Sequence, residues 1–316
     1  MTTAPQAWFM FTVGLAQVAL LLALAPVLSG MSRVLRAKFH TRRGPGVLQD
    51  YRDLLKLFQR AEVIPPEAGI VFRSAPYVFM VALLLAAFAL PALMLDSPVG
   101  AVGDLFVFIY VLALARFFLA LSGIDSGNMY AGLGASRETT IAVLNEPVML
   151  LSLFVAALST GSTNLGTMAR ELAFGHTASM AATGLAALAF AFSAFVEMGK
   201  LPFDFAEAEQ ELQEGPLTEY SGRALALMKW GIYLRQAVMA AIFIGVFLPF
   251  GAARELAPLP LLWAVLWFCV KLVVIFAGIS LVENSMARMR FLDSSRVILV
   301  AVGAAVLAFA FSLAGV

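Results

Sequence analysis

Apolar runs of about 20 residues dominate the chain and alternate with short segments that contain charge, Gly or Pro. A helix of that length crosses the hydrocarbon core of a bilayer, about 30 Å at 1.5 Å per residue. Eight such runs occur, near residues 7–29, 76–95, 104–122, 139–160, 178–199, 224–249, 259–282 and 296–314. Because open sheet edges would leave backbone groups unpaired in lipid, the pattern predicts an all-α fold with eight transmembrane helices.

The composition is typical of a membrane protein. Apolar residues make up 61% of the 316 positions and charged residues 13%, against roughly 25% charged in soluble domains. The mean hydropathy is +0.91. We therefore expect residues 1–316 to form a single integral membrane domain. The net charge of +1 gives no general attraction to nucleic acid, which is not an expected partner.

Metal-binding side chains are scarce in this chain. Its one cysteine, Cys269, lies inside an apolar run, and its two histidines are His40 and His176. Iron–sulfur and zinc sites need several thiolate or imidazole ligands. We therefore expect no cofactor in this chain, so any redox metal must be bound by another subunit.

If consecutive spans cross the membrane in alternate directions, their connecting segments fall on two sides of the membrane. The positive charges are unevenly divided between these two sides. The segment 30–75 and the later segments on its side carry fifteen of the 21 Lys and Arg residues, whereas the opposite side has Arg170 and Arg254. Basic residues gather in cytoplasmic loops. The asymmetry predicts that the charged loops face the cytoplasm and that both termini lie outside.

The segment 47–61 has the pattern of an amphipathic helix. Apolar residues recur at helical spacing and basic residues recur every four positions beside them. The apolar positions are Leu54, Leu57, Phe58 and Ala61, and the basic ones are Arg52, Lys56 and Arg60. Such a helix can lie among anionic lipid headgroups or form a floor under a docked protein, and the pattern alone leaves both open.

The segment 201–222 contains six acidic residues and no basic one, on the side where positive charge gathers. If it is helical, one face carries Asp204, Glu207, Glu211 and Glu214. Like charges in a row favour groups that take up and release protons. The alternative is a solvated acidic loop.

Several ionisable residues fall within or beside the predicted spans. Charges at membrane depth cost about 2.5–3.5 kcal/mol each, so they pair, face water or serve transport. Glu146 and Lys271 are the deepest, and Pro147 after Glu146 frees a backbone carbonyl beside it. The others are Arg116, Glu197, Lys229, Arg235 and Glu283. They form either a chain of proton-exchanging groups or structural ion pairs.

Four long motifs resemble one known family. They are RRGPGVLQDYRDLLKLF at 42–58, GASRETTIAVLNEP at 134–147, EMGKLPFDFAEAEQELQEGPLTEYSG at 197–222 and ARMRF at 287–291. In this order they resemble the subunit 1 family of respiratory complex I. The third motif, with MKWG at 228–231, is most similar to the branch that contains the membrane subunits of formate hydrogenlyase and hydrogenase-4.

The resemblance implies a non-catalytic membrane anchor of a complex I-like redox complex of the group 4 nickel–iron hydrogenase kind, in the cell inner membrane. It implies as partners a nickel–iron large subunit, an iron–sulfur small subunit and antiporter-like membrane subunits. The metal centres are then expected in those partners. The loops 30–75 and 201–223 would dock the peripheral arm. The docking residues in the first loop would be Arg42, Arg43, Gly44, Asp50, Arg52, Asp53 and Lys56.

The resemblance also implies a proton path through acidic side chains, with Arg137 as a charged neighbour. With the membrane charges described above, its expected members are Glu146, Glu197, Asp204, Glu207, Glu211, Glu214, Glu219, Lys229, Arg235, Lys271 and Glu283. Complex I has a glutamate where this chain has Ile232, and an arginine where it has Glu283. These differences favour a complex in which the electrons reduce protons instead of a quinone.

Three other functions remain open on the sequence. One is a quinone-site subunit of a complex I-like oxidoreductase. Another is a self-contained ion transporter, which would need a midplane site formed by broken helices. The third is a scaffold with inert charges.

Overall fold

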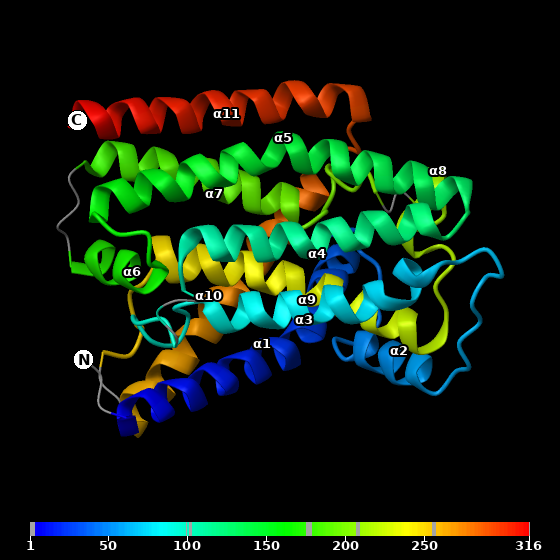
Figure 1. Cartoon of the computed structure of the whole chain (residues 1–316), viewed down its shortest axis with the longest axis horizontal. Helices are drawn as coiled ribbons and strands as arrows, with labels where there is room; N and C mark the ends of the chain where they lie inside the picture. The colour runs from blue at the N-terminus through cyan, green and yellow to red at the C-terminus, as the bar shows by residue number, and fades with distance from the viewer. Residues whose placement is uncertain are drawn as a thin grey trace.

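The computed structural model describes residues 4–98, 100, 103–174, 179–206, 209–254 and 257–315. Eight of its helices are long and apolar enough to cross a membrane, which confirms the predicted all-α fold with eight spans (Figure 1). They are α1 (Ala4–Phe39), α3 (Ile70–Ala89), α4 (Leu105–Asp125), α5 (Met129–Thr160), α7 (Met180–Glu197), α9 (Gly222–Phe247), α10 (Pro258–Ser285) and α11 (Phe291–Ala314).

Shorter helices connect these spans. The predicted amphipathic helix is present as α2 (Gln49–Phe58), which buries Leu54. The sequence pattern did not predict α6 (Leu165–Phe174), which lies at the end of the bundle opposite α2. A short helix α8 (Glu209–Leu212) and the 3₁₀ turn η1 (Gly215–Leu217) lie between α7 and α9.

Several span boundaries differ from the predicted ones, including the end of α1 and the start of α3, and two of the differences have a clear local cause. Helix α5 begins ten residues before the apolar run, because Asn128 caps it and accepts hydrogen bonds from the backbone N–H groups of Tyr130 and Ala131. Helix α3 ends at Ala89, before Pro91, since the residue preceding a proline is driven out of the helical region. The side chain of Gln17 accepts a hydrogen bond from the Leu93 N–H and so fixes the chain after this helix end.

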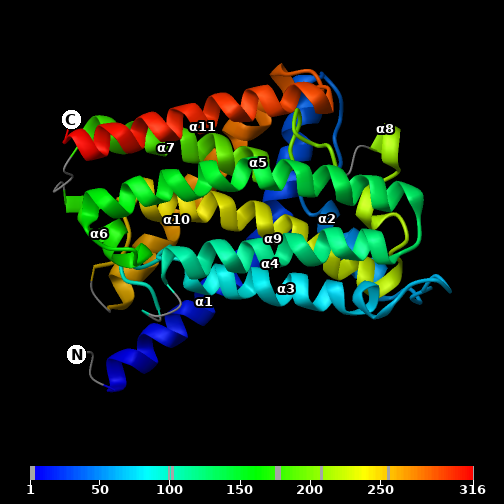
Figure 2. The same cartoon turned by 45° about the horizontal axis from the view of Figure 1, so that its top comes forward.

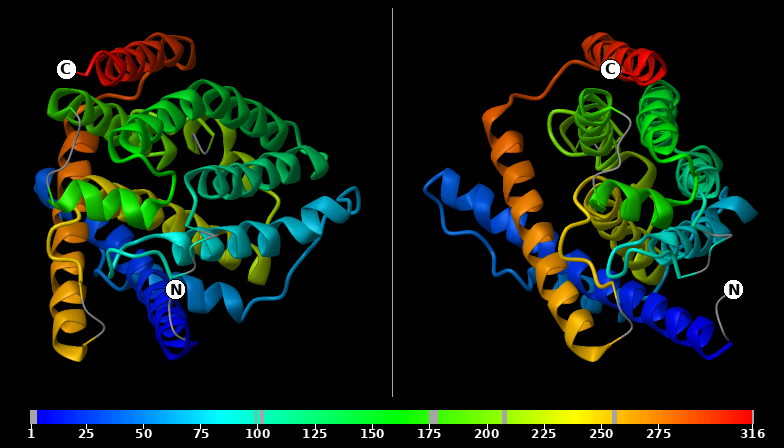
Figure 3. Two further views of the ribbon diagram at one scale, coloured as in Figure 1. Left: turned by 60° about the vertical axis from the view of Figure 1, so that its left-hand side comes forward. Right: turned by 90° about the vertical axis from the view of Figure 1, so that its left-hand side faces the viewer.

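Helix α9 occupies the centre of the bundle. It packs against α1, α3, α7 and α10 in the membrane-spanning part, against α2 at one end and against α6 at the other (Figures 2 and 3). In its most apolar window 78% of the residues are buried, against 22–50% in the other spans. Its mean hydropathy there, 1.5, is the lowest of the eight, whereas α10 and α11, the least buried, have the highest values, 2.5 and 2.7. The most apolar helices are therefore those most open to lipid.

The bundle has one end rich in charged segments and one end that holds both chain termini. Figure 1 shows the N and C labels at the same end and α2 and α8 at the other. Helix α11 lies on α5 and α7, while α10 crosses the bundle obliquely and packs against α1 and α9 (Figure 3). This arrangement agrees with spans that cross the membrane in alternate directions and so place the polar loops on one side.

Close backbone contact holds α2 against α1. A Cβ atom at Gly30 of α1 would lie 2.0 Å from the carbonyl oxygen of Val47, so only glycine allows the chain before α2 to pass so near. A hydrogen bond from Tyr51 of α2 to the Ala23 carbonyl of α1 extends this contact, and the Trp230 indole of α9 donates to the neighbouring Leu22 carbonyl. The amphipathic helix is therefore part of the packed bundle.

Candidate functional site

Arg116, on α4, gathers two carboxylates inside the charged end of the bundle. Its Nη1 donates to Glu197 Oε2 at 2.9 Å, and its Nη2 donates to Glu146 Oε2 at 3.3 Å. Glu197 is the last residue of α7, and Glu146 lies on α5 before Pro147. The side chains of Arg116 and Glu197 are 5% and 4% exposed, that of Glu146 32%. Three spans thus contribute to one buried ion cluster.

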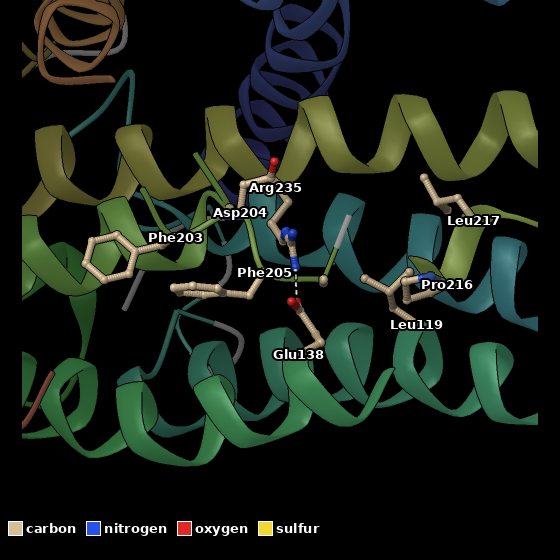
Figure 4. A pocket seen from close by; sticks show the side chains of 10 residues that line it. Leu119, Glu138, Phe203, Asp204, Phe205, Pro216, Leu217 and Arg235 are labelled. Atoms are coloured by element: carbon tan, nitrogen blue, oxygen red, sulfur yellow. Dashed lines mark hydrogen bonds and ion pairs between the residues drawn. The ribbon is translucent and has the colours of Figure 1, made fainter. Parts of the chain in front are cut away.

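A second buried ion pair lies beside this cluster. Arg235 of α9 donates from Nη1 to Glu138 Oε1 of α5 at 2.9 Å, and the two side chains are 5% and 18% exposed. Figure 4 shows the pair between two apolar walls, with Phe203 and Phe205 on one side and Leu119, Pro216 and Leu217 on the other. Charges buried in this way need a partner of opposite sign.

Three cavities adjoin the two ion groups. The first, here called the loop-side cavity, is about 20 Å³ and is lined by Arg235, Glu138 and residues of the segment 203–206. The second, the inner cavity, is also about 20 Å³ and is lined by Arg116, Glu138 and Glu197. The third, the α4–α5 pocket, is about 230 Å³ and includes Arg116, Glu138 and Glu146.

Unpaired polar atoms favour water in these cavities. Within the described residues, Glu197 Oε1 and Arg116 Nε are buried without a hydrogen-bond partner. Buried polar atoms are normally bonded to protein or to ordered water, and about 10–15 Å³ is enough for one water molecule. Both atoms belong to residues that line the inner cavity. The arrangement can therefore hold a short hydrated path between ionisable groups.

The acidic segment 201–222 does not form the continuous helix that would place four carboxylates on one face. Asp204 lies in irregular backbone, Glu211 in the single turn of α8, and Glu214 has a left-handed backbone with φ of 72°. A Cβ at Gly215 would lie 1.8 Å from the Ala206 carbonyl oxygen, so the chain folds back on itself here. The helical hypothesis is therefore wrong, and Glu207 lies outside the described residues.

The four acidic side chains of this segment that the structure describes have different partners. Arg288 donates to Asp204 at 3.0 Å, and Arg137 donates to Glu211 at 2.7 Å. Two further contacts, Lys229 Nζ to Glu214 at 3.2 Å and Asn128 Nδ2 to Glu219 at 2.5 Å, tie the rest of the segment to α9 and α5. The carboxylates therefore face donors on neighbouring elements instead of one another.

Two residues of the predicted proton path lie apart from this site. Lys271 of α10 donates to the backbone carbonyls of Leu248 and Phe250 beyond the far end of α9, and its ammonium lies 3.9 Å from the Phe250 ring centroid. Glu283 is buried and pairs with Arg36 at the end of α1. The structure brings together Glu146, Glu197, Asp204 and Arg235 at the three cavities described here. Among the described members of the predicted path, those that line none of these cavities are Lys271, Glu283, Glu211, Glu214, Glu219 and Lys229.

The predicted docking residues of the segment 30–75 divide into two groups. Arg42, Arg43, Arg52 and Lys56 are exposed, and within the described ranges none of these four cations has an ion-pair partner. Asp50 is fully buried and pairs with Arg33 at 2.8 Å, and Asp53 accepts a hydrogen bond from Gln49. Gly44 packs its backbone on α1. The four cations are therefore available to a partner, while Asp50 holds α2 in place.

Tyr220 links the end of the acidic segment to α3. Its hydroxyl donates to the Phe72 carbonyl at 2.8 Å, and its ring stacks on Phe72 with centroids 4.1 Å apart. Burial raises the pKa of the Tyr220 phenol, while a hydrogen bond with Ser122 acts in the opposite direction. The residue therefore stays protonated and serves as a donor.

Glu138 is a site residue that the sequence pattern did not identify. It follows Arg137 in the second family motif and precedes the apolar run at 139–160, so the pattern places it outside the predicted span. The signal that could have identified it is the Asn128 cap, since a helix that starts there carries Glu138 toward the membrane. Among the described residues no group of His, Cys, Asp and Glu is arranged to hold a metal ion.

Comparisons with known proteins agree with the sequence motifs. The family model described as NADH dehydrogenase matches residues 11–313. "Hydrogenase-4 component C" of Escherichia coli K12 is 50% identical over 307 residues, which cover 97% of each chain. "Formate hydrogenlyase subunit 4" of the same organism is 49% identical over 300 residues, which cover 95% of this chain and 98% of the relative.

A solved structure has the same fold. It is a chain of the membrane-bound sulfane sulfur reductase, described as an archaeal respiratory membrane complex. The match has a TM-score of 0.81 at 22% identity and covers 95% of this chain and 99% of the other. At this identity the likeness concerns the fold alone.

Proposed function

Since the chain belongs to the NADH dehydrogenase family, the family of complex I subunit 1, we propose that it anchors the peripheral electron-transfer arm of a group 4 nickel–iron hydrogenase complex. The chain is a multi-pass, complex I-like membrane subunit. In this proposal it resides in the cell inner membrane, with its charged loops in the cytoplasm and both termini outside. In this proposal the chain binds no metal and catalyses no reaction on a substrate molecule, and its only chemistry is proton transfer.

The observation that carries the proposal is the charged end of the bundle and its connection to a buried ion cluster. The exposed cations of the segment 41–60 offer an anionic partner a contact surface that the chain itself does not neutralise. Behind this end, Asp204 and Arg235 line the loop-side cavity, and Glu197 and Arg116 line the inner cavity. A docked redox subunit and a proton path would thus meet at the same end.

The partners that fit this surface are the iron–sulfur small subunit and the nickel–iron large subunit. Two relatives are named as components of hydrogenase-4 and of formate hydrogenlyase, which supports this kind of assembly for the present chain. Antiporter-like membrane subunits would then cover part of the lipid-facing surface. Iron–sulfur clusters and a nickel–iron site belong to the partner subunits in this proposal, because the described residues offer no metal-ligand group.

Mild-detergent purification of the tagged chain tests the proposal. We expect co-purified subunits that contain iron and nickel, measured by elemental analysis, and hydrogenase activity with an artificial electron donor. The double substitution Arg52→Glu/Lys56→Glu reverses charge on exposed positions of α2 and should lower the recovered iron and nickel about tenfold at unchanged yield of the chain. Arg296→Glu, a single charge reversal on an 86% exposed side chain outside this loop, is the control for each of the two reversals and should have no effect.

Isolation of the wild-type chain as a lone polypeptide with ion-transport activity would overturn the proposal in favour of a self-contained transporter. Reduction of a quinone by the purified complex, with a quinone-competitive inhibitor blocking turnover, would instead favour a quinone-site subunit. Equal metal recovery from the α2 double variant and the wild type would remove α2 from the docking surface.

A further inference from the structure

Glu138 occupies a position that no other residue of the site shares. Its side chain lines the loop-side cavity, the inner cavity and the α4–α5 pocket. Arg235 lines the first of these, and Arg116 lines the second and third. Glu138 therefore lies between two buried guanidinium groups, at the place where the space near the surface loops meets the space between α4 and α5.

The carboxylates around these cavities outnumber the cations that face them by one. Glu138, Glu146 and Glu197 face the two cations Arg116 and Arg235, and the remaining carboxylate, Asp204, has its own partner in Arg288. The five side chains sum to a net charge of −1 when all are ionised. A proton that enters these cavities therefore meets more carboxylates than cations. Because Arg cannot release a proton usefully, the proton must reside on a carboxylate.

Arg116 holds Glu197 and Glu146 at once, so these two carboxylates share one cation. Glu138 has Arg235 as its cation, on the side of the loop-side cavity. The buried Glu197 Oε1, which has no hydrogen-bond partner within the described part of the chain, belongs to a residue of the inner cavity that Glu138 also lines. Water in the inner cavity would connect the two carboxyl groups.

From this geometry we propose that Glu138 is the relay residue through which a proton passes between the loop-side cavity and the Arg116 cluster. The inference rests on the proposed function and names the residue that gates its proton path. In the first step a hydronium in the loop-side cavity transfers its proton to the Glu138 carboxylate, so that one O–H bond breaks, another forms and water remains. The neutral carboxylic acid then binds Arg235 more weakly.

In the second step the Glu138 O–H bond breaks and the proton moves through water in the inner cavity to a carboxylate oxygen of Glu197. Glu138 is again a carboxylate and restores its ion pair with Arg235. No electron is transferred in either step. Arg235 acts as a positioning residue, because it holds the ionised form of Glu138 toward the loop side.

The test uses the purified complex in liposomes and compares Glu138→Gln with the double variant Glu138→Gln/Arg235→Gln. Both remove the carboxylate, but the double variant removes the opposing cation as well, so the net charge of the group stays at its wild-type value. We expect electron-linked proton movement, followed with a pH-sensitive dye, to fall on the order of tenfold or more in both variants. Glu171→Gln, on α6 at the opposite end, is the control and should match the wild type.

Infrared difference spectra of the same samples supply a readout that a structural role would not move. On reduction of the complex, the wild type should show a carboxylic-acid C=O band that shifts in D₂O, and this band should be missing in both Glu138 variants. Restored proton movement in the double variant would overturn the relay, since Glu138 would then serve only to neutralise Arg235. Failure of both variants to assemble would overturn it equally and assign the pair to the fold.

The wild-type measurement separates the inference from the proposed function. A wild-type chain that brings down no metal-bearing subunit contradicts the proposed function itself. A wild-type complex that moves protons while Glu138→Gln moves them at the same rate contradicts the relay alone.

Discussion

At the scale of single residues, the ion cluster around Arg116 is the most demanding feature to fold. A guanidinium with an exposed fraction of 5% holds two carboxylates from two other helices. Removing one member of a buried ion group leaves an uncompensated charge, which costs about 3–5 kcal/mol. The partners are therefore coupled, and their substitutions should not add.

We predict that Arg116→Gln lowers the free energy of unfolding of the chain by about 3–5 kcal/mol, because Glu197 stays buried without its cation. The double variant Arg116→Gln/Glu197→Gln should recover much of the loss, since both charges leave together. Thermal or denaturant unfolding in detergent measures both variants. Additive losses in the double variant would show that Arg116 and Glu197 do not interact.

Tyr220→Phe should lower the free energy of unfolding by about 1 kcal/mol, because the hydrogen bond to the Phe72 carbonyl is lost while the ring stack remains. The raised pKa adds a pH dependence. The phenol is protonated in both states below its ordinary value of 10.0. Above that value the unfolded chain releases the proton first, so stability falls as the pH rises.

Unfolding midpoints measured between neutral and alkaline pH check this prediction. The wild type should lose more stability than Tyr220→Phe above pH about 10. Parallel curves for the two proteins would mean that the phenol does not contribute to the alkaline loss.

The residue types of the site were predictable from the sequence, but their pairing was not. Glu146, Glu197 and Arg235 stood out because charge is rare in apolar runs. That Arg235 pairs with Glu138, 97 positions earlier in the chain, depends on how α5 and α9 pack. No local pattern encodes such a contact. The position of Lys271 was equally unpredictable. It is as conspicuous in the sequence as the other charges, but it donates to backbone carbonyls at the other end of the bundle.

At the scale of elements, the apolar runs predicted which segments form membrane-spanning helices, whereas caps and prolines determine where some of these helices begin and end. The pattern located the eight spans and α2, but α5 extends ten residues further because Asn128 caps it and polar residues outside lipid remain helical. The segment 201–222 could have been helical by its charge spacing. Its fold depends on the close approach of Gly215 to the Ala206 carbonyl, a tertiary contact that spacing does not reveal.

The contact between α1 and α2 gives a prediction at this scale. Gly30→Val would force side-chain atoms against the backbone of Val47, which cannot move as a flexible side chain can. We expect destabilisation by about 1–3 kcal/mol and faster proteolytic cleavage after Arg42 and Arg43 as α2 separates from α1. Gly278→Val on α10, where a Cβ meets nothing within 4 Å, is the matched control. Equal cleavage rates in both variants would contradict a tight α1–α2 contact.

At the scale of the whole molecule, the charged loops collect at one end and the termini at the other. The excess of Lys and Arg on the loop side predicts that this side faces the cytoplasm. The prediction can be checked without any partner subunit, because it concerns the orientation of this chain in the cell membrane.

In a Cys269→Ala background, we expect a membrane-impermeant thiol reagent added to intact spheroplasts to label Arg254→Cys and not Arg43→Cys. Both should react after the membrane is permeabilised, which controls for the accessibility of each thiol. Labelling of Arg43→Cys in sealed spheroplasts would reverse the orientation proposed for this protein.

The central place of α9 has a consequence for biogenesis. This span combines the weakest hydropathy of the eight with the greatest enclosure, 78%. It also leaves the ribosome after α1, α3, α4, α5 and α7, the helices that precede it in the chain. The least apolar of the eight spans therefore emerges when most of the helices that pack around it have been made. The order of synthesis therefore gives α9 protein neighbours to pack against as it enters the membrane. The more apolar α10 and α11 are made after it.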